Sequence, residues 1–131
     1  MGAEQFVTKS NSRFPDAQEA FNQAKEQEAY EHGHGGYSGT LAEKGDYVMI
    51  PVPDEMEAGN FVDHVLSYYK VDWGENKGEE HWLGNAEPDG LEQSSREAIR
   101  KAHDLVDDKW GPAGCVKDAD HGFIFFGWAS S

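Results

Sequence analysis

Apolar residues recur at three- and four-residue spacing in three stretches of the chain, which is the spacing of one face of a helix. In the first stretch, Ala17, Phe21 and Ala24 share a face, and Pro15 suits the first turn of a helix because that position needs no N–H donor. The opposite face is polar, so this helix must lie against another element. We predict helices over about residues 15–31, 54–69 and 91–109.

Three apolar runs without helical spacing predict strands. The run 47–50 is followed by two prolines, which end strand pairing because proline has no N–H to donate. Residues 113–116 form a second, short strand after Gly111 and Pro112. The run 123–128, FIFFGW, is apolar throughout, which is typical of a strand that is buried on both faces.

The order of these elements favours an α+β fold. We expect a single compact domain over residues 1–131, in which about three helices pack on a small, mainly antiparallel sheet. Residues 1–13 show no pattern and are expected to be flexible. The segment 70–90 predicts a long loop or an irregular hairpin whose two tryptophans, Trp73 and Trp82, fold back onto the core.

The charge of the chain excludes more classes of function than any motif does. The chain has 25 acidic and 11 basic residues and a net charge of −14, so phosphates and anionic lipids should repel it. We therefore expect no direct binding of nucleic acid and no membrane association. The opening MGAEQFVTKS lacks the features of a secretory signal, and Cys115 has no second cysteine to pair with. These features together predict a cytoplasmic protein.

The acidity suggests that the protein recognises a basic partner. The central segment combines acidic side chains with tryptophans that could anchor an interface, namely Trp73, Glu75, Glu79, Glu80 and Trp82. We expect a non-enzymatic binding protein that docks on a basic protein surface, for example as an inhibitor that mimics nucleic acid and occupies the groove of a nucleic-acid-handling enzyme. The charge has a simpler alternative role, because it also keeps proteins soluble and suits an environment of high salt.

A glycine-rich loop after the first helix provides an alternative site. Its candidate ligand-binding residues are His32, His34, Tyr37, Ser38, Thr40 and Lys44. This loop lacks the Gly-Lys-Ser/Thr ending of a phosphate-binding loop, and serine in such a turn is normally a turn residue. His32 and His34 could ligate a metal, but the sequence has no second ligand pair, and capping of the helix explains both. We predict no cofactor and no catalytic residue, and a small-ligand, nucleotide or metal-dependent enzyme remains the alternative.

Three segments resemble parts of small uncharacterised proteins from prokaryotes and their viruses: AYEHGHGGYSGTLAEK, KWGPAG and FFGWASS. The resemblance implies a compact accessory protein of the kind that a virus or mobile element encodes, and it transfers no catalytic residue. A further alternative is a structural subunit of an assembly, in which the FIFFGW strand pairs between chains.

Overall fold

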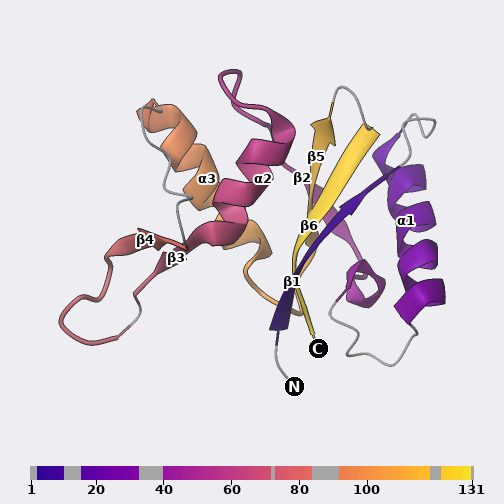
Figure 1. Cartoon of the computed structure of the whole chain (residues 1–131), viewed down its shortest axis with the longest axis horizontal. Coiled ribbons are helices and arrows are strands. Elements are labelled where there is room, and N and C mark those ends of the chain that lie inside the picture. Colours follow the sequence, from indigo (N-terminus) through magenta and orange to yellow (C-terminus); the bar gives the residue numbers. More distant parts are fainter. Residues whose placement is uncertain are drawn as a thin grey trace.

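A computed structural model describes residues 3–10, 16–32, 40–71, 73–83, 92–118 and 122–130. Helices and strands alternate irregularly along these residues (Figure 1). In chain order they are β1 (Ala3–Lys9), α1 (Ala17–His32), the 3-10 turn η1 (Leu41–Glu43), β2 (Tyr47–Met49), α2 (Ala58–Ser67), β3 (Tyr68–Lys70), β4 (Glu80–Trp82), α3 (Gln93–Val106), β5 (Ala113–Asp118) and β6 (Gly122–Ser130).

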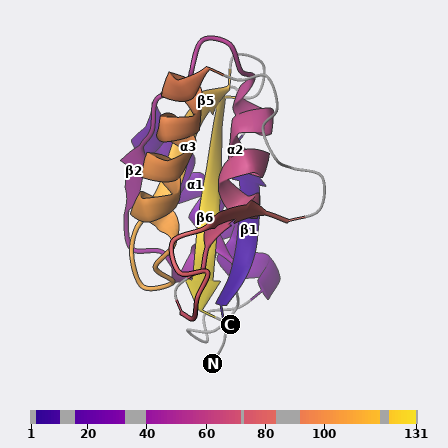
Figure 2. The same ribbon diagram turned by 90° about the vertical axis from the view of Figure 1, so that its left-hand side faces the viewer.

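A four-stranded sheet in the order β1-β6-β5-β2 forms the centre of the fold. The pairs β1–β6 and β5–β6 are antiparallel, whereas β2 is parallel to β5, so the sheet is mixed but mainly antiparallel. Helix α1 covers one face, and α2 and α3 lie side by side on the other (Figures 1 and 2). The predicted α+β fold class is confirmed.

Strand β6 separates two apolar cores because its side chains alternate between the faces of the sheet. Ile124 and Phe126 point into the core under α2 and α3, whereas Phe123, Phe125 and Ala129 point into the core under α1. Burial of both faces explains why the run lacks the alternation of polar and apolar residues that a one-sided strand shows. The prediction from this run is confirmed.

The helices begin and end at different residues from those that the apolar spacing predicted, and α2 and α3 are shorter than predicted. Helix α1 begins after Asp16, whose carboxylate accepts a hydrogen bond of 2.8 Å from the N–H of Glu19 and so caps the first turn. Helix α2 begins only at Ala58 and ends at Ser67, because the chain turns directly into strand β3. Helix α3 ends at Val106, before the predicted stop at Gly111.

The expectation that residues 1–13 are flexible does not hold for 3–9, whereas residues 1, 2 and 11–13 lie outside the described residues. Residues Ala3–Lys9 form β1, which pairs with β6 from Ala3 opposite Ser130 to Lys9 opposite Ile124. Of this strand only Phe6 is buried, so its own sequence shows almost no apolar pattern. Pairing with a distant strand, and not local periodicity, makes it a strand.

The central segment forms the short hairpin that was one of the two expected outcomes. Strands β3 and β4 pair antiparallel, with Tyr68 opposite Trp82, and make a separate two-stranded sheet. Among the described residues, no helix has the length and the apolar character needed to cross a bilayer.

Candidate functional site

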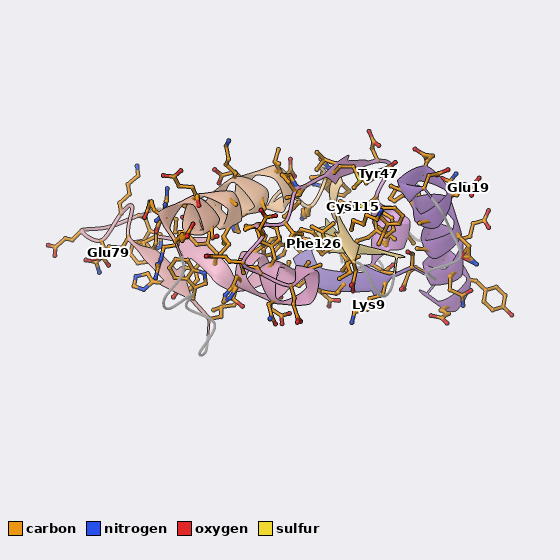
Figure 3. The ribbon with its side chains drawn as sticks, turned by 90° about the horizontal axis from the view of Figure 1, so that it is seen from above. Lys9, Glu19, Tyr47, Glu79, Cys115 and Phe126 are labelled. Carbon is orange, nitrogen blue, oxygen red and sulfur yellow. The ribbon has the colours of Figure 1, made fainter. Side chains whose placement is uncertain are left out.

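The hairpin of β3 and β4, with the loop that joins them, projects from the end of the molecule opposite α1 (Figure 1). We call residues 68–82 the hairpin arm. Viewed from above, Glu79 of this arm lies at one tip of the elongated molecule and Glu19 of α1 lies near the other (Figure 3). The arm contains all five residues that the sequence singled out for partner binding.

An ion pair fixes the base of the arm to helix α3. The guanidinium of Arg100 pairs with Glu80, including a hydrogen bond of 2.9 Å from Nη2 to Oε2, and the hydroxyl of Tyr68 donates to Glu80 Oε1 at 3.1 Å. The hydrogen bond from Arg100 lowers the pKa of Glu80, and burial together with Glu80 raises the pKa of Tyr68 to about 12. Glu80 is therefore ionised and committed to the fold at neutral pH.

The two tryptophans of the arm occupy different environments. Trp82 packs against the core under α2 and α3, with its ring edge-on to Tyr68 at 5.2 Å between centroids. Trp73 is 79% exposed. The expectation that both tryptophans fold back onto the core is therefore correct for Trp82 and wrong for Trp73.

Backbone hydrogen bonds shape the loop that carries Trp73. Val71 N donates to Glu79 O at 3.0 Å, and Gly78 N donates to Val71 O at 2.8 Å, so the loop is closed at its neck. Gly74 and Gly78 have φ of 82° and 96°, a region that favours glycine. The exposed side chains of Glu75 and Glu79 lie in this closed loop with Trp73.

Exposed acidic side chains are not confined to the arm. Each of the three helices carries some, for example Glu19 on α1, Asp63 on α2 and Glu97 on α3, and the arm itself contains Lys70 and Lys77. The negative charge is thus spread over the described surface, and charge alone does not select one face. The arm differs from the rest in combining exposed carboxylates with a projecting tryptophan.

The alternative ligand loop falls largely outside the described residues. His34, Tyr37 and Ser38 lie in 33–39, and His32 is the last residue of α1, where its side chain is not described. Thr40 caps η1, because its hydroxyl accepts a hydrogen bond of 3.2 Å from Ala42 N.

Lys44, the last candidate of that loop, points into the protein. Its side chain is 1% exposed, and its Nζ donates to the carbonyl oxygens of Asp108, Lys109 and Gly111 at 3.2, 3.2 and 3.0 Å. All three ammonium protons are thereby used within the chain, which leaves none for a ligand. Burial lowers the pKa of Lys44.

His103 of α3 is a polar residue of interest that the sequence analysis did not single out. Its ring lies between Tyr68, at 4.9 Å, and Trp128, at 5.4 Å, and its side chain is only 14% exposed. Burial lowers the pKa of its imidazole, although Asp107 and Asp104 oppose this. A hollow of about 430 Å³ borders the ring. The spacing of His103 and Asp107, one helical turn apart, was the available signal.

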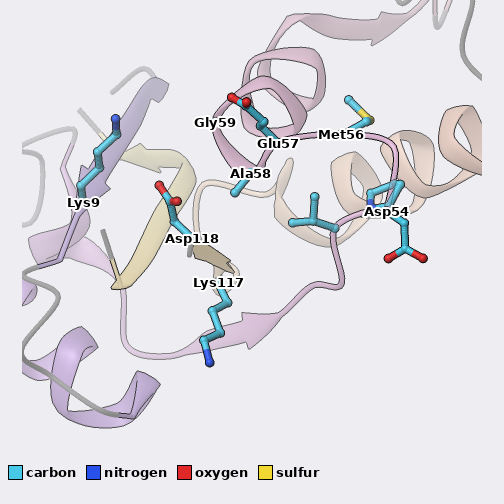
Figure 4. Close-up of a pocket in the computed structure, with 10 residues that line it drawn as sticks. Lys9, Asp54, Met56, Glu57, Ala58, Gly59, Lys117 and Asp118 are labelled. Carbon is cyan, nitrogen blue, oxygen red and sulfur yellow. The ribbon is translucent and has the colours of Figure 1, made fainter. Parts of the chain in front are cut away.

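Two further features are poor candidates for a ligand-binding or catalytic site. A hollow of about 630 Å³ at the start of α2 contains Lys9 and Lys117, but these side chains extend in different directions and lie among Asp54, Glu57 and Asp118 (Figure 4). Cys115 is buried, and burial raises the pKa of its thiol to about 12. Such a thiol is not a nucleophile at neutral pH.

Compared with protein-family models, curated proteins and solved structures, the chain matches none of them. Its function is therefore inferred from its own residues and their geometry.

Proposed function

We propose that the protein is a non-enzymatic binding protein, and that its hairpin arm docks on a basic surface of a partner protein. The observation that carries this proposal is the 79% exposure of Trp73 in the loop of an arm whose base is fixed. Tryptophan is enriched among the residues that dominate binding energy at protein interfaces, and this one is carried on a loop that projects from the molecule (Figure 1).

The construction of the arm favours recognition. The ion pair of Glu80 with Arg100 and the packing of Trp82 hold its base, while the hydrogen-bonded neck holds the loop. A preorganised loop loses little conformational entropy when it binds. Trp73 would insert into an apolar pocket of the partner, and Glu75 and Glu79 would face its basic rim.

The remaining negative charge has a supporting role. A net charge of −14 that is spread over the molecule attracts a basic surface over long range and repels nucleic acid and other acidic proteins. A nucleic-acid-handling enzyme in the cytoplasm, with its basic groove, is the partner class that this charge suits best.

Trp110 supplies a matched control for Trp73. It is also exposed, at 65%, but it lies after α3, and the ammonium of Lys109 is positioned over its ring at 5.4 Å. Its exposure is similar, whereas its location and its cationic neighbour differ. A partner that uses the arm should therefore be insensitive to Trp110.

The test is affinity capture from cells that express the protein, followed by calorimetry with the captured partner at low and high salt. We expect Trp73→Ala to weaken binding by at least about 30-fold, corresponding to roughly 2 kcal/mol for a dominant interface residue. The double variant Glu75→Lys/Glu79→Lys should also weaken binding, and the loss of affinity should be larger at low salt than at high salt. Trp110→Ala should bind as the wild type does. Glu80 is left unchanged because its loss would disturb the arm. A partner whose affinity ignores both arm variants would disprove the proposal.

A further inference from the structure

Three potential metal ligands meet at the C-terminal end of α3. One donor atom each from His103, Asp104 and Asp107 lies within 4.8 Å of the other two. The distance between His103 Nδ1 and Asp104 Oδ1 is 3.9 Å. This group is independent of the residues that carry the proposed docking function.

The Nδ1 atom of His103 has no hydrogen-bond partner among the described residues, and Asp104 Oδ1 lies 3.9 Å from it. His103 Nδ1 is buried and forms no hydrogen bond, and its distance from Asp104 is too long for one. Buried polar atoms in folded proteins are nearly always hydrogen-bonded or bound to an ion, so an orphaned nitrogen requires an explanation. The rings of Tyr68 and Trp128 both pack edge-on against the imidazole and restrict its rotation.

The surroundings favour a cation. The C-terminus of a helix carries partial negative charge, which adds to that of the two carboxylates. Asp107 is the C-cap residue that directly follows α3, and its N–H donates to the carbonyl of His103 at 2.9 Å, so the end of the helix brings the two residues together.

We infer that His103, Asp104 and Asp107 form a binding site for a divalent transition metal of the zinc class, with a fourth position open to water. One imidazole nitrogen and two carboxylate oxygens suit zinc, whereas calcium and magnesium prefer oxygen ligands throughout. Tetrahedral bonds of about 2.1 Å require donors about 3.4 Å apart, so donor atoms that lie up to 4.8 Å apart must approach one another by up to about 1.4 Å. Both aspartates are exposed, with the Asp104 side chain at 80%, so they can rotate to do this.

The test is a titration of the metal-free protein with Zn²⁺ by calorimetry, and with Co²⁺ by its visible absorption, which reports the ligand geometry. His32 and His34 are replaced by alanine in every protein compared, because these two residues are a separate potential source of metal binding. We expect one Zn²⁺ per chain. Loss of a residue that only hydrogen-bonds to a metal ligand weakens metal binding by roughly 10- to 100-fold. Asp104→Asn and Asp107→Asn each remove a direct ligand and should weaken binding by more than this.

Two matched controls make the outcome specific. Asp63→Asn removes an exposed charge from α2. His81→Asn removes an imidazole that lies 3.4 Å from Glu79 and that has no third potential ligand grouped with it in the described part of the chain. Neither should change the affinity. His103→Asn should abolish binding, and because this residue is packed, its fold is checked by circular dichroism. Absence of binding in the background variant, or binding that survives both aspartate substitutions, would overturn the inference.

Discussion

The indole ring of Trp82 lies edge-on against the phenol ring of Tyr68, with 5.2 Å between their centroids. Tyr68 directly follows α2, and its hydroxyl group donates to Glu80, the residue that begins β4. This contact therefore joins both strands of the hairpin arm to the core. It also divides the arm into a base that belongs to the fold and a tip that is available for contacts.

Replacement of each tryptophan of the arm should separate these two roles. Trp82→Ala removes a ring that packs against the core and should lower the free energy of unfolding by roughly 2 to 4 kcal/mol. Trp73→Ala removes an exposed ring and should change it by less than about 0.5 kcal/mol. Urea denaturation measures both. Equal losses would mean that Trp73 also packs in solution.

The ion pair at the base of the arm should make stability depend on acid pH. The pKa of Glu80 is lower in the folded state than its ordinary value of 4.5, so its stabilising contribution is complete above that value and is lost as the pH falls below it. We expect Glu80→Gln to cost about 1 kcal/mol at neutral pH. This cost should shrink as the pH falls through the lowered pKa of the Glu80 carboxyl, because the wild-type carboxylate then becomes protonated.

Glu79→Gln is the matched control for this prediction, because the Glu79 carboxylate is exposed and forms its ion pair, among the described residues, with the exposed His81 at 3.4 Å. Denaturation curves over a pH series measure the difference between the variants. A cost for Glu80→Gln that stays constant from neutral to acid pH would contradict a carboxylate of lowered pKa.

Lys44 should stabilise the turn after α3. Lys44→Met removes the three hydrogen bonds to the carbonyl oxygens of Asp108, Lys109 and Gly111 and should cost roughly 2 to 3 kcal/mol, because it leaves carbonyl groups without their donors. Lys101→Met, on the exposed surface of α3, should cost less than about 0.5 kcal/mol. Chemical denaturation again gives the values, and a similar cost for both variants would show that water replaces the ammonium group.

Gly114 is required by close packing across the sheet. A Cβ atom at this position would lie 2.7 Å from Phe126 Cζ and 2.9 Å from Val106 Cγ1, and both neighbours are fully buried. Gly114→Ala should therefore cost about 1 to 3 kcal/mol through overpacking. Gly45→Ala, where a Cβ atom meets nothing within 4 Å, should be nearly neutral. Thermal denaturation measures the melting temperatures of both variants, and equal melting temperatures would refute this account.

Part of the candidate site could be predicted from residue types alone. The combination of acid and tryptophan between residues 70 and 90 indicated the segment that projects as the arm. The separate roles of its members could not be predicted, because exposed and buried tryptophans have the same side chain, and only their neighbours distinguish them. In the same way, the spacing of His103 and Asp107 places them on one helical face, but the rings that enclose the imidazole come from other elements.

The sequence by itself determined the α+β class, three helical stretches and the strand buried on both faces, because apolar periodicity reports locally which side of an element is covered. Only the tertiary structure decided the pairing of β1 with β6, the burial of the Lys44 ammonium group against carbonyls after α3, and the split between Trp73 and Trp82. These outcomes depend on contacts between residues that are far apart in the chain. The local pattern indicates that a surface is buried, whereas the element that covers this surface is determined only when the whole chain folds.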